Sequence, residues 1–244
     1  MITAETFLRQ AKFKGFDFFT GVPCSFLTPL INGVLNDTDT EYVAAASEGE
    51  AVAIAAGAWL CGRETVVMFQ NSGLGNAVNP LTSINFPFKI PTLIICTWRA
   101  GPGLEDEPQH ALMGQITPDL FEVMRIPYSL FPNDDELVPV RLGDAKSQMT
   151  ESGLPSAFIM QKGDVSDQEL TSHGNDVPRA AGILTDRRGH GSFPSRYVTL
   201  EALVSVAPDN AGIIATTGKS LRELFTIADR RQHFYQVGSM GCAA

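Results

Sequence analysis

The sequence has few cysteines and histidines and no long apolar run. Its four cysteines are widely spaced and form no Cys-x-x-Cys pair, which is typical of reduced thiols rather than of a disulfide framework. The four histidines are equally scattered, so we predict no zinc site built by the protein. No apolar stretch reaches the roughly 20 residues that span a bilayer, and the first residues do not resemble a signal peptide. We therefore expect a cytoplasmic protein with no membrane partner.

Positive charge is also scarce. The 244 residues include 18 Lys and Arg against 27 Asp and Glu, and the net charge of −9 argues against a nucleic-acid partner. If the substrate is an anion, cations near the site must overcome this background locally. The hydrophobic content of 44% is ordinary for a globular protein, and the length suffices for one large core or two smaller ones.

Apolar strands alternate with helices over the first two thirds of the chain. Strands are expected at 16–20, 42–46, 65–70, 92–97, 128–131 and 156–161. Helices are expected at 3–11, 26–35, 48–60, 112–124 and 134–150, with one more after the Gly-rich loop 71–76 that Pro80 interrupts and that ends by Pro87. This alternation predicts an α/β fold with a doubly wound, six-stranded parallel sheet. Its functional site should lie beyond the carboxyl ends of the strands.

The composition changes after residue 163. Ser, Asp, Gly, Pro, His and Arg dominate 164–195, which indicates a linker. A second strand and helix pattern occupies 196–244, with helices at 197–206 and 221–227 and strands at 212–216 and 234–237. About 50 residues are too few for a doubly wound domain of usual size. We therefore expect 1–163 to form one domain and 196–244 to be the truncated start of another.

The junction between the second strand and its helix carries two carboxylates. Ser47 and Glu50 have the Ser-x-x-Glu spacing of a capping box, which gives Glu50 a structural role. Glu48 has no such role and lies at the first helical position, where the helix dipole favours an anion. The helix behind it is almost all Ala and Gly, so it should be buried, and a poorly hydrated carboxylate is suited to proton transfer. The alternative is an ordinary acid in a first helical turn.

The run Ser47-Glu48-Gly49-Glu50, followed by an Ala-rich helix and Gly57, resembles the activating-glutamate segment of thiamine-diphosphate enzymes. Segments 20–25, 70–76, 106–110 and 216–219 resemble the phosphonopyruvate decarboxylases of that family, and the sulfopyruvate decarboxylases share the first two more loosely. The resemblance implies thiamine diphosphate and Mg2+ as cofactors and 3-phosphonopyruvate as substrate. It also implies a homodimer or higher homo-oligomer with sites between subunits.

Residue roles follow from this resemblance. Glu48 would hydrogen-bond the aminopyrimidine ring and promote ylid formation. Residues 1–163 would be the pyrimidine-binding domain and 196–244 the start of the diphosphate-binding domain. The cofactor-binding residues would be Glu48, Asn71, Gly73, Thr217, Gly218, Ser239 and Met240. The family's Gly-Asp-Gly metal motif is missing, so its ligands are expected beyond Ala244, and this chain alone is expected to be inactive.

Four polar residues are candidates to hold the substrate's carboxylate and phosphonate: Ser25, Arg99, His110 and Lys219. Arg99 suits a dianion because its planar fork binds two oxygens at once, whereas the alternative is an ion pair with Glu105 or Asp106. His110 is a candidate proton donor to the carbanion, and its alternative is a helix cap. For Ser25 the alternative is an ordinary helix cap in a strand-to-helix turn.

Other functions stay open at this point. One is sulfopyruvate decarboxylation, which differs only in the tetrahedral anion. Another is a non-catalytic fragment that only dimerises through its Ala-rich helix. A third is an unrelated nucleotide-binding α/β protein that uses the loop with Gly73 and Gly75 for phosphate.

Overall fold

The computed structural model describes residues 1–172, 182, 185, 189, 191–216 and 218–237. They fall into two compact units, Met1–Thr171 and Ser172–Val237, which are described separately. In this described part of the chain, no helix is long and apolar enough to cross a membrane.

The first unit contains the predicted six-stranded sheet. Its strands are β1 (Phe16–Gly21), β2 (Glu41–Ala44), β3 (Glu64–Gln70), β4 (Leu93–Thr97), β5 (Tyr128–Leu130) and β6 (Ser156–Met160). They lie in the order β2-β1-β3-β4-β6-β5, and every pair is parallel. Every residue of β4 and of β6 is buried, as expected for strands covered on both faces. The prediction of a doubly wound parallel sheet is confirmed.

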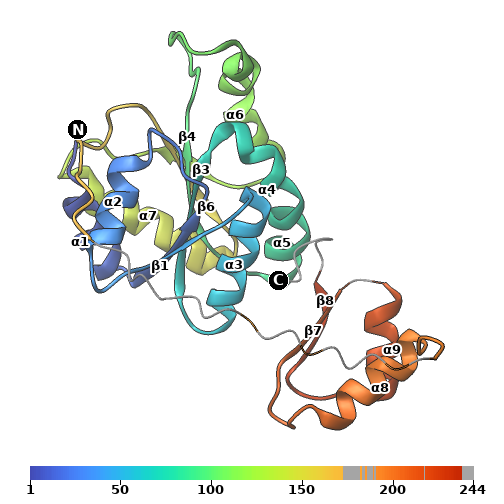
Figure 1. Cartoon of the computed structure of the whole chain (residues 1–244). Helices are drawn as coiled ribbons and strands as arrows, with labels where there is room; N and C mark the ends of the chain where they lie inside the picture. Colours follow the sequence, from blue (N-terminus) through green and yellow to red (C-terminus); the bar gives the residue numbers. More distant parts are fainter. Residues whose placement is uncertain (173–181, 183–184, 186–188, 190, 217, 238–244) are drawn as a thin grey trace. The chain divides into compact units, whose positions relative to one another are not determined.

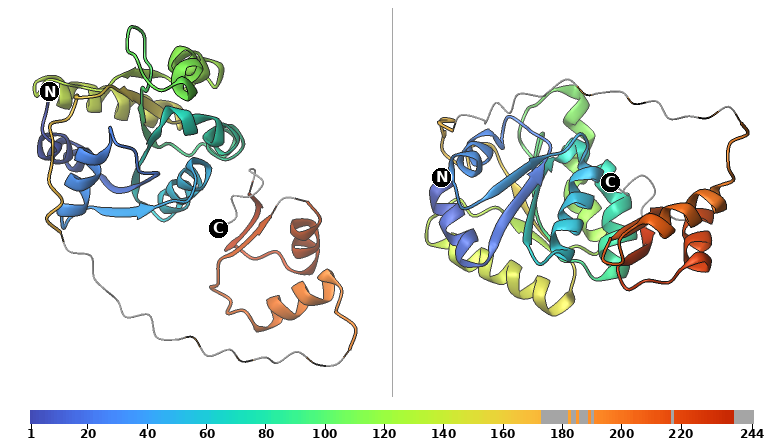
Figure 2. Two further views of the ribbon diagram at one scale, coloured as in Figure 1. Left: turned by 45° about the horizontal axis from the view of Figure 1, so that its top comes forward. Right: turned by 60° about the horizontal axis from the view of Figure 1, so that its bottom comes forward.

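Helices cover both faces of this sheet (Figures 1 and 2). The helices are α1 (Ala4–Phe13), α2 (Thr28–Asn36), α3 (Glu48–Leu60), α4 (Leu74–Pro80), α5 (Phe86–Phe88), α6 (Ala111–Val123) and α7 (Leu137–Ser152). Side chains alternate across β3, so Val66 and Met68 pack with the core of α1, α2 and α7. Val67 and Phe69 pack with α3, α4 and α6. The break expected at Pro80 is a π-helical turn, Leu81–Asn85.

The start of α2 differs from the expectation. The helix begins at Thr28 and its N-cap residue is Leu27, which makes no side-chain capping bond. Pro29 lies in the first turn, where its fixed φ and missing N–H cost nothing. Ser25 therefore precedes the helix in a separate turn, and the interpretation of Ser25 as the helix cap is wrong.

The segment 164–171, which its composition placed in the linker, packs against the first unit. Val165 is buried in the core beside α1 and pairs with Ile2 in a parallel bridge. Asn32 on α2 donates a side-chain hydrogen bond to the Gln168 carbonyl at 2.8 Å. A single apolar residue among polar neighbours gives little sequence signal, which is why composition alone missed this contact.

The second unit is small. It consists of α8 (Arg196–Val206), β7 (Ile213–Thr216), α9 (Lys219–Ile227) and β8 (His233–Val237). The two strands pair in parallel, and Val204, Ala215 and Leu224 form the buried core.

Candidate active site

The site lies where the chain reverses its direction across the sheet. The connection after β1 leads outward to β2, and the next one crosses back over β1 to β3. Loops that follow strands on either side of such a switch point leave a crevice at the carboxyl edge of the sheet. The residues after β1, β2, β3 and β4 all emerge at this edge.

Glu48 is held at the start of α3. Half of the predicted capping box forms, because Ser47 Oγ accepts from the Glu50 N–H at 3.2 Å. Glu50 Oε2 reaches one residue beyond the N-cap and accepts from the Ala46 N–H at 2.5 Å, so Glu50 still serves the helix start. Glu48 takes no part in it and is only 8% exposed. Among the described residues it has one hydrogen-bond partner, because Asn76 Nδ2 donates to its Oε2 at 2.8 Å. Asn76 thus orients a buried carboxylate that makes no capping hydrogen bond with the described residues at the start of α3.

Gly73 provides the floor beneath this carboxylate. A Cβ atom on Gly73 would lie 2.0 Å from both Cδ and Oε1 of Glu48, so no other residue fits there without moving Glu48. Gly73 ends the short 3-10 turn Asn71–Gly73 that follows β3. The backbone of this turn and the Glu48 side chain at the start of α3 therefore approach each other closely.

Asn71 clamps the loops after β3 and β4 together. It is fully buried, and its side-chain amide donates to the Arg99 carbonyl and to Thr117 Oγ1, both at 3.0 Å. Its Oδ1 accepts from the Arg99 N–H at 3.1 Å. Both amide protons are used within the fold, so Asn71 acts on the site by positioning Gly73 and Arg99.

Arg99 makes a bidentate ion pair. Its Nε and Nη2 donate to the two carboxylate oxygens of Asp106, each at 2.5 Å, and the side chains are only 19% and 10% exposed. These hydrogen bonds hold the pKa of Asp106 well below its usual range and raise the pKa of Arg99. The guanidinium also stacks 4.8 Å from the centre of the Phe26 ring. The sequence offered Glu105 or Asp106 as an ion-pair partner for Arg99, and the partner in the structure is Asp106.

His110 lies near the same edge. It ends the 3-10 turn Pro108–His110 and is 8% exposed. Its Nδ1 is 2.8 Å from Ser72 Oγ, in the loop after β3. It is the N-cap residue of α6 by position, but its side chain makes no capping hydrogen bond, so the side chain is available to the site.

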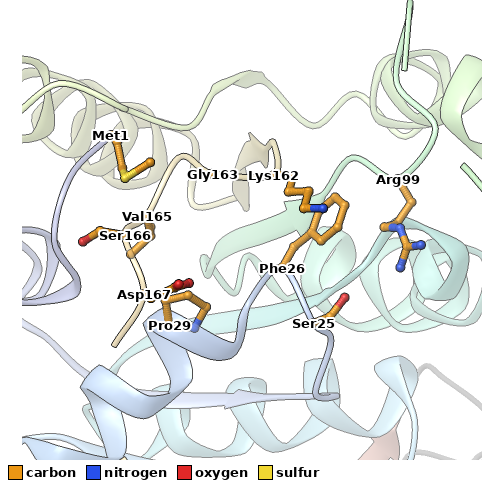
Figure 3. Close-up of a pocket in the computed structure, with 10 residues that line it drawn as sticks. All are labelled: Met1, Ser25, Phe26, Pro29, Arg99, Lys162, Gly163, Val165, Ser166 and Asp167. Carbon is orange, nitrogen blue, oxygen red and sulfur yellow. The ribbon is translucent and has the colours of Figure 1, made fainter. Parts of the chain in front are cut away.

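A cavity of about 440 Å3 opens beside these loops (Figure 3). Its walls are Met1, Ser25, Phe26, Pro29, Arg99, Lys162, Gly163, Val165, Ser166 and Asp167. The structure thus brings together Ser25 and Arg99, two of the predicted substrate ligands. Sequence reasoning missed Lys162, although it follows the buried strand β6 at the expected edge. Within the part of the chain that the structure describes, no carboxylate forms an ion pair with Lys162.

The remaining predicted residues belong to the end of the chain. Lys219 is the first residue of α9, and Gly218 before it has a φ of +110°, which favours glycine. Thr217, Ser239 and Met240 lie outside the described residues. Among the residues that are described, no cluster of three His, Cys, Asp or Glu could hold a metal ion.

Comparison with known proteins identifies the family. A model of the N-terminal, thiamine-pyrophosphate-binding domain of thiamine pyrophosphate enzymes matches residues 1–123. The chain belongs to the thiamine pyrophosphate enzymes. The alternative of an unrelated nucleotide-binding protein is therefore wrong.

Relatives within this family are carboxy-lyases. The chain is 44% identical to phosphonopyruvate decarboxylase of Streptomyces viridochromogenes over 248 residues, which cover 100% of this chain and 62% of that protein. The Streptomyces hygroscopicus enzyme of the same name is 43% identical over 100% of the chain and 61% of its own length. Sulfopyruvate decarboxylase subunit alpha of Methanococcus maripaludis is 34% identical over 66% of this chain and 95% of that subunit. The chain thus spans about three fifths of the phosphonopyruvate decarboxylases it matches.

Solved structures agree on the fold. The thiamine diphosphate-dependent 4-hydroxybenzoylformate decarboxylase of Rhodococcus jostii superposes on 88% of this chain and 39% of its own, with a TM-score of 0.55 and 20% identity. Benzoylformate decarboxylase of Polynucleobacter necessarius superposes on 88% and 38%, with a TM-score of 0.54 and 21% identity.

Proposed function

We propose that the protein takes part in phosphonate biosynthesis by decarboxylating 3-phosphonopyruvate to phosphonoacetaldehyde and CO2 with thiamine diphosphate. The observation that carries this proposal is the Glu48 carboxylate, buried on Gly73 at a helix start. The full-length identity to phosphonopyruvate decarboxylases supports the choice of substrate. Bound thiamine diphosphate supplies the electron sink that the acyl carbanion left by CO2 requires.

The geometry around Glu48 fits the pyrimidine side of this cofactor. Asn76 fixes Oε2, whereas Oε1 has no hydrogen-bond partner among the described residues. A buried acceptor with one oxygen oriented and the other free suits a ring N–H. Glu48 would hold and exchange a proton at that ring. The other proposed cofactor-binding residues are Gly73 and Gly218, together with Thr217, Ser239 and Met240, which lie outside the described part of the chain. Mg2+ is proposed to bind with the diphosphate.

The cavity lined by Ser25, Arg99 and Lys162 fits the anionic tail of the substrate. Ser25 offers a hydroxyl and Arg99 keeps the Nη1 protons that Asp106 does not use. Lys162 adds a cation to this cavity. Separately, the family resemblance makes Lys219 a proposed substrate ligand. His110 is the proposed catalytic group that contacts the reacting substrate. We also propose that the protein works as a homodimer or larger homo-oligomer.

A second candidate is sulfopyruvate decarboxylation, favoured by the match over 95% of the Methanococcus subunit. Decarboxylation assays of the natural gene product, supplied with thiamine diphosphate and magnesium, distinguish the two candidate functions. We expect kcat/KM to be highest for 3-phosphonopyruvate, lower for 3-sulfopyruvate and lowest for pyruvate. A preference for sulfopyruvate would move the assignment to the second candidate, and no turnover of any of the three acids would overturn both.

A further inference from the structure

A chain of hydrogen bonds joins the loops at the ends of β1 and β3 to the loop that follows β4. It begins at Cys24, whose Sγ donates to Gln70 Oε1 at 3.2 Å. Gln70 Nε2 donates to Ser72 Oγ at 2.7 Å, and Ser72 Oγ is 2.8 Å from His110 Nδ1. Four side chains, separated by up to 86 positions, are thus linked in one line that ends at the proposed catalytic histidine.

The direction of this chain is set at Gln70. A glutamine amide has a carbonyl end that only accepts and an amino end that only donates. In this structure the Gln70 carbonyl end accepts from the Cys24 thiol and the amino end faces Ser72. Ser72 Oγ therefore accepts from Gln70, which leaves its own proton free for another acceptor.

That acceptor is His110 Nδ1. In a neutral imidazole one ring nitrogen carries the proton and the other accepts, and the neighbouring hydrogen bond decides which is which. A Ser72 hydroxyl that donates to Nδ1 makes Nδ1 the acceptor. The proton of the neutral ring is then on Nε2.

The second nitrogen faces the accessible side of the ring. His110 is 8% exposed, and Nε2 has no hydrogen-bond partner among the described residues. In the described part of the chain, the polar side-chain atoms that are both fully buried and without a hydrogen-bond partner are on Thr20, Glu64, Asn85 and His233. Nε2 of His110 is not among them, so it keeps contact with solvent. The buried nitrogen is thus fixed by Ser72, and the nitrogen that a ligand can reach is Nε2.

We propose that Ser72 and Gln70 are positioning residues that hold neutral His110 as its Nε2–H tautomer. His110 then presents an N–H donor to an oxygen of the anionic 2-oxo acid, which a neutral ring in the opposite tautomer cannot do. The identity of that acceptor rests on the proposed function. The tautomer itself does not, because it follows from hydrogen bonds within this chain.

The tautomer can be measured without substrate or cofactor. Long-range 1H–15N correlation spectra of the whole 244-residue chain, labelled in histidine, distinguish the two nitrogens above the ordinary histidine pKa of about 6.5. The sequence has only four histidines, so a His110→Gln variant identifies the signal. We expect Nε2–H to dominate at His110. A dominant Nδ1–H signal would overturn the proposal.

Three variants test the cause. Gln70→Glu replaces the donating amide by an acceptor of the same shape, so Ser72 must donate to it and accept from Nδ1–H, and we expect the tautomer to invert. Ser72→Ala removes the hydroxyl and should lower the ratio of Nε2–H to Nδ1–H about fivefold, the value of one net hydrogen bond. Ser83→Ala, whose hydroxyl binds only Asn79 within the described residues, is the matched control and should change nothing. An unchanged tautomer in Gln70→Glu would overturn the proposal.

A kinetic measurement links the tautomer to the reaction. In the gene product, Gln70→Glu should lower kcat/KM for phosphonopyruvate about tenfold, and Ser72→Thr, which keeps the hydroxyl, should restore most of the activity that Ser72→Ala loses. A wild-type protein that shows the Nε2–H tautomer but decarboxylates nothing would overturn the proposed function alone. A wild-type protein that decarboxylates phosphonopyruvate with the Nδ1–H tautomer would overturn this inference alone.

Discussion

The charge of Lys162 gives the sharpest test of the proposed substrate site. A phosphonate near neutral pH carries up to one more negative charge than a sulfonate, and pyruvate has no tail anion at all. Arg99 cannot supply this charge by itself, because Asp106 binds it through two oxygens at 2.5 Å and neutralises it locally. Lys162 is the lining cation that no carboxylate pairs with in the described part of the chain. We therefore predict that Lys162 distinguishes the dianion.

The size of the effect follows from the exposure of Lys162. A hydrogen bond to a charged group contributes about 1.5–3 kcal/mol, and solvent screens an exposed lysine, so the lower end applies. About 1.4 kcal/mol corresponds to a tenfold change. Lys162→Gln, which keeps most of the length and removes the charge, should lower kcat/KM for phosphonopyruvate about tenfold. The loss should be smaller for sulfopyruvate and negligible for pyruvate.

The assay compares the three acids in wild type, in Lys162→Gln and in a control. Lys14→Gln is the matched control, since Lys14 lies at the end of α1 before β1, away from the carboxyl edge of the sheet. An equal loss for all three acids would show that Lys162 supports the fold or the common 2-oxo acid group. No loss for phosphonopyruvate would show that the tail binds elsewhere. Either result refutes the reasoning about this cavity.

Further predictions concern the residues around Glu48 and Arg99. Glu48→Gln should abolish decarboxylation and hydrogen–deuterium exchange at the thiazolium carbon without changing the melting temperature. Glu50→Gln should stay active. Exchange at the wild-type rate in Glu48→Gln would exclude Glu48 as the group that exchanges a proton with the pyrimidine ring. Gly73→Ala should displace the Glu48 carboxylate and cost about 1–3 kcal/mol of stability in denaturant unfolding, and wild-type stability would contradict the close contact. Asp106→Asn should destabilise the fold by about 2 kcal/mol at neutral pH, while Asp39→Asn, on an exposed carboxylate, should not. Because the folded pKa of Asp106 is lowered, its stabilisation is complete above the unfolded value of about 3.9 and is lost as the pH falls toward the folded value, so wild type and Asp106→Asn should converge in acid.

Local signals in the sequence determined the fold and the first catalytic candidate. The capping box at Ser47 and Glu50 depends on residues three apart, and it left Glu48 as an acid without a capping role. Continuous apolar runs such as Leu93–Thr97 identified strands that are buried on both faces. These patterns are local in the chain, so they are visible without any knowledge of strand order.

The partners of the site residues were decided by the tertiary structure. Arg99 binds Asp106, His110 binds Ser72, and Asn71 uses its amide to clamp two loops, although each had other possible partners in the sequence. Lys162 shares a cavity with Ser25 and Arg99 because β6, β1 and β4 end at the same edge of the sheet. Arg99 and Asp106 lie within one loop, but the contacts of His110 and Asn71 join loops that follow different strands. They depend on the order and register of those strands, and no local pattern in the sequence encodes that order.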